Sequence, residues 1–469
     1  MFQRFRRWRW FWPFAIALCL TLASSLWRIN SASPKALAPA LPLLPQDPTV
    51  QVFFNQSEAS VYTDPYRHIE RYGDDLEKII ITAIEQSTQS IDLAVQSLNL
   101  PRVAQAIVQS ARRGIRIRIV LENEYANPTS AAAKAEQTAA WAAIADTDGN
   151  GPLTLAEIAQ ADALQILRSA QIPLIDDTAD GSKGSGLMHH KFMVIDSRWV
   201  ITGSANFTLS GIHGDGDEPA SRGNANALLR IDSAALAQRF SLEFNQLWGD
   251  GPGASPNSLF GLKKPHRPAQ DFTLPASSVT LQFSPLSPSQ PWEASVNGLI
   301  ARTLTQATRS IDLALFVFSD QLIANQLQPK AAAGKALRVL IDPSFLYRNY
   351  SEALDMLGVT LRDQRCQVEK DNQPWAKPIA TVGFPQLPPG DKLHHKFAVI
   401  DEATVIIGSQ NWSKAANTEN DETLLVIRNP TVAAHFEREF ERLYRSPQIG
   451  GTPLLKRKIA ENQQRCPSP

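Results

Sequence analysis

The sequence contains the stretch MHHKFMVID at residues 188–196 and repeats it as LHHKFAVID at residues 393–401. An apolar run follows the lysine in both copies, as expected of a strand that is buried on both faces of a sheet. His-x-Lys in an extended segment places the imidazole and the ammonium group on the same face, because side chains alternate along a strand. The stretch therefore predicts a buried strand that begins with a histidine and a lysine, and its repetition predicts a duplicated domain.

The neighbouring segments repeat in the same order. The strand-like pattern SIDLA occurs at residues 90–94 and 310–314, and each copy follows a helix-like segment. Each half closes with the helical pattern FxxEFxxL, at residues 240–247 and 436–443. Strands that alternate with helices predict sheets covered by helices on both faces. We therefore expect an α/β protein built from two duplicated α/β/α half-domains.

The repeats also divide the chain into segments. The expected segments are a signal anchor or signal peptide (1–29), a Pro-rich linker (30–50), a first half (51–250) with an insertion at about 131–170, a second linker (251–275), a second half (276–450) and a tail (451–469).

The N-terminus indicates where the protein works. Four arginines precede an apolar run at residues 10–27, which is the pattern of a signal anchor or a signal peptide. Positive charges stay on the cytoplasmic side, so the rest of the chain is expected across the membrane from the cytoplasm. We expect an extracytoplasmic protein, periplasmic or secreted, that its N-terminus holds at the membrane, and whether this segment is cleaved stays open.

Composition narrows the function classes. Lys+Arg and Asp+Glu both number 46, so the formal net charge is zero, whereas a dedicated nucleic-acid-binding protein usually carries a basic excess. Three cysteines are too few for a disulfide framework. Cys366 and Cys466 could pair outside the cytoplasm, and the sequence leaves that pairing open.

The repeated stretch belongs to a longer pattern, HxK-x4-D-x6-GSxN, which is identical in spacing in both halves. Two matches at equivalent points of a duplicated unit argue strongly against chance. Each half offers an imidazole, an ammonium group and neutral hydrogen-bond donors, so two halves that face each other would hold one tetrahedral phosphate between two histidines. The candidate catalytic residues are His189, Lys191, Asp196, His394, Lys396 and Asp401.

With these motifs the chain resembles the phospholipase D superfamily, over about residues 51–450. The resemblance implies an active site at a pseudo-twofold interface between the halves, and a monomer, because one chain holds both half-sites. It implies that His189 attacks phosphorus to form a phosphohistidine, while His394 acts as the acid and then the base. The side chains that would neutralise the phosphate oxygens are Lys191, Lys396, Asn206 and Asn411, and the serines that would support them are Ser204 and Ser409. The resemblance also implies that catalysis needs no metal. Asp196 and Asp401 lie outside the His-Lys pair, which favours a structural role for them.

One position departs from the family pattern. Glu422 fits the carboxylate that orients the motif histidine of its own half, which predicts that it partners His394. Asn226 replaces this acid in the first half, and the longer loop before it carries Asp215, Asp217 and Glu218, one of which could substitute. A neutral partner is compatible with His189 as the nucleophile, because that histidine must begin unprotonated.

A second motif lies in the insertion. Residues 146–157 fit a twelve-residue EF-hand loop, with oxygens at the ligand positions, glycine at position six and Ala-rich, helix-like segments on both sides. The predicted ligands of a structural Ca²⁺ are Asp146, Asp148, Asn150, Pro152, Thr154 and Glu157.

These observations favour a phospholipase D that hydrolyses phospholipid at a membrane surface. Apolar residues expected at the rim support a lipid substrate; they are Phe345, Trp375, Phe384 and Trp412. The alternatives are an endonuclease with the same two-histidine chemistry, against which the zero net charge counts, and a phosphatidyltransferase of the cardiolipin-synthase type. A calcium-dependent binding module with a relic site is disfavoured, because both motifs are intact.

Overall fold

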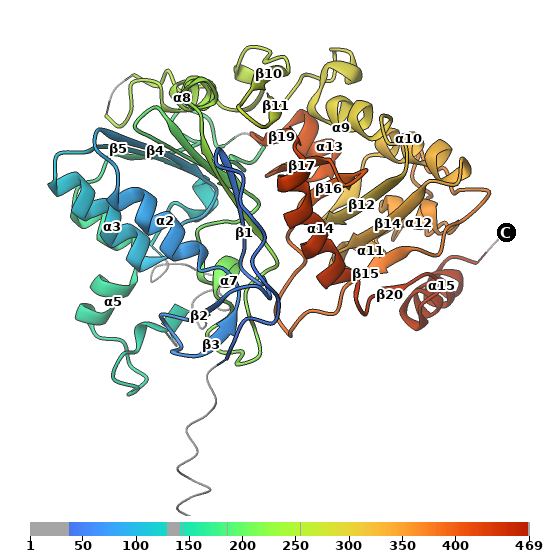
Figure 1. The fold of residues 1–469 in the computed structure, drawn as a ribbon, viewed down its shortest axis with the longest axis horizontal. Helices are drawn as coiled ribbons and strands as arrows, with labels where there is room; N and C mark the ends of the chain where they lie inside the picture. Colours follow the sequence, from blue (N-terminus) through green and yellow to red (C-terminus); the bar gives the residue numbers. More distant parts are fainter. Residues whose placement is uncertain (1–36, 129–140, 143, 185, 254, 468–469) are drawn as a thin grey trace, which may run out of the picture.

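The computed structural model describes residues 37–467 except 129–140, 143, 185 and 254. The chain forms two α/β halves that lie side by side (Figure 1). The first half holds a seven-stranded sheet in the order β1-β9-β8-β7-β4-β5-β6. Its strands are β1 Val50–Phe54, β4 Ser90–Val95, β5 Arg116–Leu121, β6 Leu174–Asp176, β7 Lys191–Ile195, β8 Trp199–Gly203 and β9 Ala227–Asp232.

The second half repeats this order with additional edge strands. Its sheet runs β10-β11-β19-β17-β16-β12-β14-β15-β20, so β16 occupies the place of β7, and β12 that of β4. The strands are β10 Gln270–Thr273, β11 Ser278–Phe283, β12 Ser310–Leu315, β14 Ala336–Ile341, β15 Val382–Phe384, β16 Lys396–Ile400, β17 Thr404–Gly408, β19 Thr423–Arg428 and β20 Gln448–Ile449. Two small ribbons, β2 Val61–Thr63 with β3 Glu70–Tyr72 and β13 Phe318–Ser319 with β18 Trp412–Ser413, complete the pairing.

Helices cover both faces of each sheet, which confirms the predicted α/β/α halves. The described α-helices are α2 Leu76–Glu85, α3 Pro101–Arg112, α5 Leu155–Ala161, α6 Ala163–Ser169, α7 Leu209–Ile212, α8 Ala234–Trp248, α9 Val296–Leu304, α10 Gln321–Ala332, α11 Pro343–Leu346, α12 Glu352–Met356, α13 Lys414–Thr418, α14 Pro430–Tyr444 and α15 Pro453–Arg465. Short 3-10 turns occur at η1 Asn123–Tyr125, η3 Gly261–Lys263 and η4 Trp292–Ala294.

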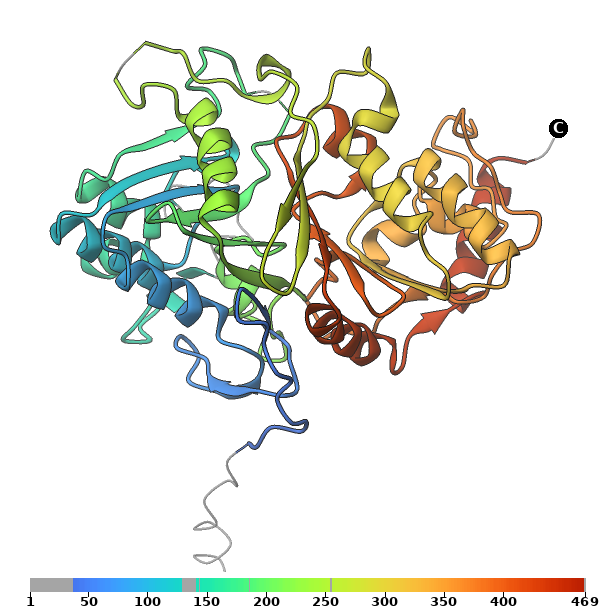
Figure 2. The same cartoon turned by 45° about the horizontal axis from the view of Figure 1, so that its top comes forward.

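The FxxEFxxL helices form the central layer between the two sheets. In α14, Asn429 caps the first turn, and Phe436, Phe440 and Leu443 are buried on one face at helical spacing. Burial of each such side chain stabilises the fold by roughly 1.5–3 kcal/mol. One hydrophobic core joins α8 and α14 with strands of both sheets, while separate outer cores lie under α2 and α3 and under α9 and α10. Figure 2 shows the two halves side by side, and the shared core is where they pack together.

Strand register brings the functional loops to one edge of the molecule, which we call the catalytic edge. Val95 at the end of β4 pairs with Lys191 at the start of β7, and Phe54 at the end of β1 pairs with Ala227 at the start of β9. In the second half, Leu315 pairs with Lys396 in the same way. The residues that precede β7 and β9 therefore lie at one edge of the first sheet, and those that precede β16 lie at the equivalent edge of the second. Isolated bridges between Met188 and Asp421 and between Ala225 and Leu393 join these two edges.

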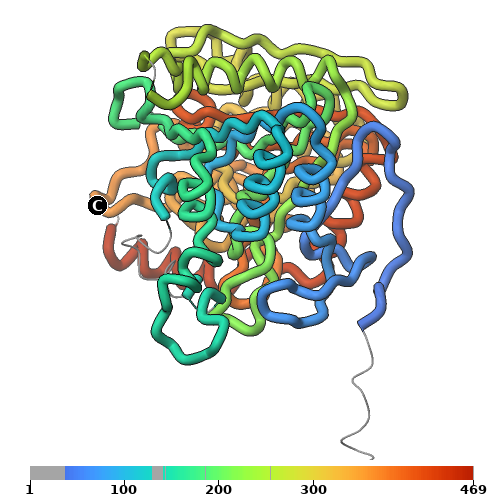
Figure 3. The backbone as a smooth tube through the Cα atoms, turned by 90° about the vertical axis from the view of Figure 1, so that its left-hand side faces the viewer, coloured from blue at the N-terminus to red at the C-terminus, as the bar shows by residue number. Residues whose placement is uncertain are grey.

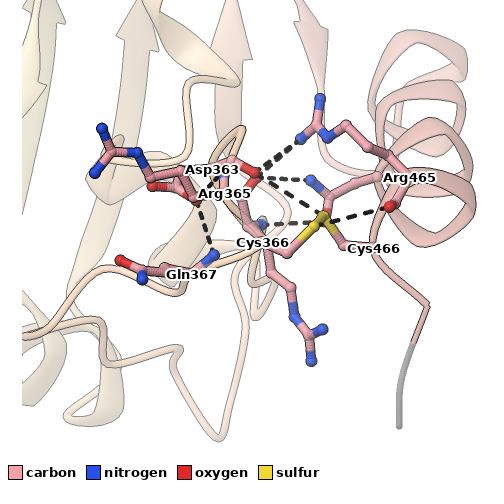
Figure 4. Close-up of a disulfide and its surroundings, with 8 residues drawn as sticks. Asp363, Arg365, Cys366, Gln367, Arg465 and Cys466 are labelled. Carbon is pink, nitrogen blue, oxygen red and sulfur yellow. Dashed lines mark hydrogen bonds between the residues drawn. A yellow bond between two sulfur atoms is a disulfide. The ribbon is translucent and has the colours of Figure 1, made fainter.

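The segment set apart as a tail contains α15, which packs on the second half through the buried Leu455. Cys366 and Cys466 form a disulfide that joins the loop after α12 to the end of this helix (Figure 4). The second linker contributes η3 and also β10, which pairs with β11. Among the described residues, no helix is long and apolar enough to cross a membrane, and the predicted anchor at 1–29 lies outside the described residues.

Candidate active site

Each motif segment pairs with a segment of the other half. The His189 N–H donates to the Asp421 carbonyl oxygen (3.0 Å), and the Asp421 N–H donates to the Leu187 carbonyl oxygen (2.8 Å). On the other side of the interface, the His394 N–H donates to the Ala225 carbonyl oxygen (3.1 Å). These two short parallel bridges bring the motifs together at the catalytic edge.

The bridges decide which residue orients each histidine. His189 Nδ1 lies 2.7 Å from the Glu422 carboxylate, and His394 Nδ1 lies 2.9 Å from the Asn226 amide oxygen. Each histidine is therefore oriented by a side chain from the opposite half. In both pairs Nδ1 is the hydrogen-bonded nitrogen, which directs Nε2 toward substrate.

Two predictions were wrong. Glu422 does not partner His394, and Asn226 does not take the partner position of His189. The physical reason is the backbone bridge, because Glu422 follows Asp421, which pairs beside His189. The predicted substitutes also lie elsewhere, since Asp215 stands near Gly390 in a rim loop. His189 therefore has the acidic partner and His394 the neutral one.

A buried hydrogen-bond network fixes the Asn226 amide. Its Nδ2 donates to the carbonyl oxygens of Gly211 (2.8 Å) and Asn224 (3.2 Å). Its Oδ1 accepts from the Ser204 hydroxyl (2.8 Å) and faces His394. The amide oxygen can only accept, so His394 must present an N–H at Nδ1.

The GSxN turns support the orienting residues. Ser204 and Ser409 are fully buried, and they accept the backbone N–H of Ala227 (3.0 Å) and of Thr423 (2.9 Å). The preceding glycine is required because a Cβ at Gly203 would lie 2.2 Å from the Ala227 carbonyl oxygen. The turn therefore supports the site from beneath, and its hydroxyls point into the protein instead of toward an anion as expected.

The two motif lysines are buried cations with few protein partners. Lys191 Nζ donates to the His189 carbonyl oxygen (2.8 Å) and to Gln96 (3.2 Å), while Lys396 Nζ donates to the His394 carbonyl oxygen (2.7 Å). Burial lowers the pKa of Lys191 to about 7 and holds the pKa of Lys396 well below its usual range. A bound anion would offset this desolvation.

The histidines are poised in the neutral form when no anion is bound. Burial, with the charges of Lys191 and Lys396, holds the pKa of His189 and of His394 well below the usual value. A neutral imidazole whose Nδ1–H is hydrogen-bonded carries its lone pair on Nε2. The site therefore combines two Nε2 atoms and two buried ammonium groups at one point, as a phosphodiester would require.

Comparison with known proteins identifies the family. The family described as "Cardiolipin synthase, PLD-like domain" matches residues 80–248 and 300–444, which include both motifs. The chain belongs to this phospholipase D-like family. It is accordingly a member of the phospholipase D superfamily.

The relatives of this phospholipase D-like protein match part of the chain. This chain is 31% identical over 145 residues to mitochondrial cardiolipin hydrolase of Homo sapiens, and the match covers 31% of this chain and 49% of that protein. It is 30% identical over 152 residues to the Mus musculus protein of the same name, covering 32% and 59%. The chain thus spans about half the length of these curated relatives. The crystal structure of phosphatidylserine synthase from Haemophilus influenzae Rd KW20 aligns with a TM-score of 0.56 at 12% identity, over 90% of this chain and 94% of that one, which is a likeness of fold.

The motif aspartates do not touch the reacting groups. The Asp196 carboxylate accepts the backbone N–H groups of Thr88 (2.8 Å), Gln89 (2.7 Å) and Ser90 (2.9 Å). Asp401 binds the start of β12 in the same way. Both lie at the far end of the motif strands from the histidines, so their inclusion in the catalytic set is corrected to a structural role.

The two motif asparagines each have a buried amide oxygen without a hydrogen-bond partner among the described residues, and Asn206 also lies beside Lys191. Asn206 Nδ2 donates to Gln96 Oε1 (3.1 Å), which also accepts from Lys191. The amide oxygens of Asn206 and Asn411 are buried and, among the described residues, have no hydrogen-bond partner. This shared feature marks both amides as groups that can rearrange around a bound phosphate.

Sequence analysis missed residues that differ between the halves. Gln96 follows β4 and holds Lys191, whereas the equivalent Phe316 follows β12 and lies 4.9 Å from His394, ring to ring. Phe345 packs against Phe316 at 4.7 Å. Alignment of the SIDLA repeats extends to these positions and would have found them. The site of this phospholipase D-like protein is therefore polar beside Lys191 and aromatic beside His394.

The expected apolar rim is only partly present. Phe345 and Phe384 are half-buried, but Trp375 and Trp412 are fully buried in the outer core of the second half. Their burial reflects packing under α10 and α12, so the tryptophans cannot contact a lipid. The aromatic surface near the site comes from Phe316 and Phe345 instead.

The insertion brings the predicted calcium ligands together in part. Carboxylate oxygens of Asp146, Asp148 and Glu157 lie within 4.8 Å of one another. The Asp146 carboxylate accepts the Gly151 N–H (2.7 Å), and Thr154 caps α5, whose third residue is Glu157. Three hard oxygen donors at this spacing fit Ca²⁺. The first flanking helix falls largely on residues 129–140, outside the described residues.

Proposed function

We propose that the protein is a phospholipase D that hydrolyses a membrane phospholipid to phosphatidic acid and an alcohol. The observation that carries this proposal is a pair of histidines, each oriented by a side chain of the opposite half, together with two buried lysines. The bound phosphodiester anion offsets the charges of Lys191 and Lys396, so His394 takes up a proton at Nε2 when substrate binds. In the first step, His189 Nε2 bonds to phosphorus, the P–O bond to the head group breaks, and the His394 imidazolium gives its Nε2 proton to the leaving alkoxide. In the second, His394 takes a proton from water, whose oxygen bonds to phosphorus and releases His189.

Three observations favour a lipid over a nucleic acid. The formal net charge is zero. The leaving-group side beside His394 is aromatic, with Phe316 and Phe345 half-buried at the site. The relatives noted above are named as cardiolipin hydrolases, which makes an anionic phospholipid the first substrate to test.

We also propose an extracytoplasmic location and a structural calcium ion. The Cys366–Cys466 disulfide supports an oxidising compartment. The oxygens of Asp146, Asp148 and Glu157 would hold Ca²⁺, and Asn150, Pro152 and Thr154 would complete the loop. Such an ion would order the insertion, and the chemistry at the histidines proceeds without it.

The test is a parallel turnover assay on the purified full chain. Substrates are vesicles of phosphatidylcholine, phosphatidylethanolamine or cardiolipin, and single- and double-stranded nucleic acid. His189→Asn is the matched control for contaminating activity. We expect release of phosphatidic acid or its cardiolipin counterpart by the wild-type protein and not by the variant.

Cleavage of nucleic acid with silent lipids would overturn the lipid proposal and make the protein an endonuclease with the same two histidines. Formation of a new phosphatidyl ester when glycerol or serine is added, without net hydrolysis, would make it a phosphatidyltransferase.

A further inference from the structure

The chain enters the described structure at the catalytic edge. The Leu37 N–H donates to the Glu70 carboxylate on β3 (3.0 Å), and the Ala40 N–H donates to the Glu58 carbonyl oxygen (2.9 Å). Figure 1 shows the first described residues, in dark blue, beside β2 and β3. The N-terminal end of the folded body is therefore tied to the hairpin that follows β1.

That hairpin contacts the loop that builds the active site. Arg67 on the hairpin donates to the carbonyl oxygen of Ser221 (3.0 Å), and Arg71 donates to that of His213 (2.5 Å). The same loop leads to Asn226, which orients His394. The entry point and the catalytic histidines thus belong to one connected edge.

Residues 37–49, which we call the strap, are held along their length. From the entry point the strap runs along α14, where Arg438 donates to the Pro42 carbonyl oxygen (2.6 Å) and His435 contacts that of Pro45 (3.1 Å). At the far edge Asn429 donates to the Asp47 carboxylate (2.8 Å). Figure 3 shows the strap rising beside β1, in blue, along the length of the molecule. The strap, which is the described part of the Pro-rich linker, is therefore bound to both halves and adds no length to the tether.

Only residues 28–36 remain between the strap and the apolar run at residues 10–27. At full extension they reach about 30 Å. A folded body of this size is roughly 55 Å across, from the scaling of radius of gyration with chain length. A tether that leaves from the catalytic edge is too short to turn the opposite edge toward the membrane.

We infer that the catalytic edge faces the bilayer in which residues 10–27 are anchored, and that the enzyme acts on lipids of that same membrane. The inference rests on the proposed function for its substrate and on the expected anchor at residues 10–27 being retained, and the orientation then follows from the entry point and the tether length. Figure 1 places α5 and the predicted calcium loop at the same end, so the insertion also points toward the lipid surface.

The orientation is tested on the full chain in vesicles of phosphatidylcholine with phosphatidylglycerol. Cys19→Ala leaves Cys366 and Cys466 in their disulfide, so one added cysteine carries a donor dye. Lys392→Cys and Asp217→Cys place the dye at exposed sites on the catalytic edge. Glu402→Cys and Arg198→Cys place it in exposed turns at the opposite edge. The acceptor is a lipid-linked dye, and energy transfer is the readout.

We expect clearly higher transfer from positions 392 and 217 than from 402 and 198. Insertion of a 30-residue Gly/Ser spacer between residues 33 and 34 adds roughly 30 Å of mean reach and should shrink the difference. Equal transfer from both edges, the reverse order, or a chain that does not float with the vesicles would overturn the inference. If orientation is found but no lipid is cleaved, the orientation stands and the proposed substrate falls. If lipid is cleaved while the edges are equal, the substrate stands and the orientation falls.

Discussion

Glu422 of the second half orients His189 of the first, with 2.7 Å between its carboxylate and the imidazole Nδ1. The reciprocal contact is made by an amide, since Asn226 orients His394 at 2.9 Å. A carboxylate stabilises a positively charged imidazole much more than an amide does. The two histidines are therefore geometrically equivalent and electrostatically different.

This asymmetry assigns their roles. The nucleophile becomes cationic when its Nε2 bonds to phosphorus, so a carboxylate partner lowers the barrier to attack. The acid must release a proton, so a neutral partner keeps its imidazolium acidic. We infer that His189 is the better nucleophile and His394 the better acid. The family resemblance implies the same assignment, whereas the premise that Asn226 partners His189, which was compatible with it, was incorrect.

A trapping experiment separates the roles. With a p-nitrophenyl phosphodiester the leaving group needs no proton, so His394→Asn should release a burst of p-nitrophenol and accumulate a phosphohistidine. The expected turnover after the burst is lower by a factor on the order of 10²–10⁴, because the base for water is lost. Rapid quench and mass spectrometry of the intact protein would show the adduct.

The matched variant is His189→Asn, which should show neither a burst nor an adduct. An adduct on His189→Asn and none on His394→Asn would reverse the assignment.

Replacement of the orienting residues tests the electrostatic argument. Burial raises the pKa of Glu422 to about 7, and its ionised form is the one that stabilises a cationic His189. The kcat/KM of the wild-type protein should therefore rise with pH through about 7, and Glu422→Gln should lose that limb while kcat falls on the order of 10²–10⁴-fold.

The companion variant is Asn226→Asp, which gives His394 an acidic partner and makes it a weaker acid. We expect its rate to depend more steeply on leaving-group pKa than the wild-type rate does. A pH profile unchanged in Glu422→Gln would show that Glu422 serves only to pack the site.

The fold could be predicted because its signals are local. The continuous apolar run after each HxK motif predicts a buried strand, and the duplication is visible because the SIDLA and HxK segments recur in the same order in both halves. The exchange of partners between halves could not be predicted, since His189 and Glu422 are 233 residues apart and a backbone bridge between Met188 and Asp421 brings them together. The disulfide was undecided for the same reason, because spacing along the chain does not give distance in space.

Calcium should stabilise the insertion without affecting chemistry. At 100 times its dissociation constant a ligand adds about 2.7 kcal/mol to the stability of the unit that binds it. Trp141 is buried in the insertion and hydrogen-bonded to the Ala161 carbonyl oxygen (3.0 Å), which provides a fluorescence readout. We expect added Ca²⁺ to raise the melting temperature of the wild-type protein and chelator to lower it, with turnover retained at low temperature.

The variants Asp146→Asn and Glu157→Gln should abolish the calcium-dependent shift, while the exposed Asp217→Asn should keep it. A shift that persists in both loop variants would place the calcium effect elsewhere in the protein.

The disulfide should matter for stability and not for catalysis. It closes a loop with a sequence separation of 100 residues, for which the chain-entropy estimate is about 4.7 kcal/mol and typical measured values are 2–4 kcal/mol. Cys366 is exposed, so a reductant can reach the bond. Dithiothreitol should lower the melting temperature of the wild-type protein and leave that of Cys366→Ala/Cys466→Ala unchanged. Equal melting temperatures for the oxidised protein and the double variant would show that α15 contributes no stability through this bond.

Glu352 is predicted to be a destabilising residue of the second half. It is 3% exposed at the start of α12, and burial, together with the charges of Asp355 and Glu369, raises its pKa to about 9 from 4.5. The folded protein therefore keeps a proton that the unfolded chain releases above pH 4.5, so stability falls as pH rises from 4.5 toward 9. At pH 7 this titration lowers the free energy of unfolding by about 3 kcal/mol relative to its value below pH 4.5. Glu352→Gln removes the titration and keeps the shape, so urea unfolding should show a higher free energy at pH 7 and a flatter dependence between pH 5 and 8. The exposed Glu402→Gln is the matched control and should leave the pH dependence as it is; an equal gain in both variants would mean that lost surface charge, and not the buried proton at Glu352, is the cause.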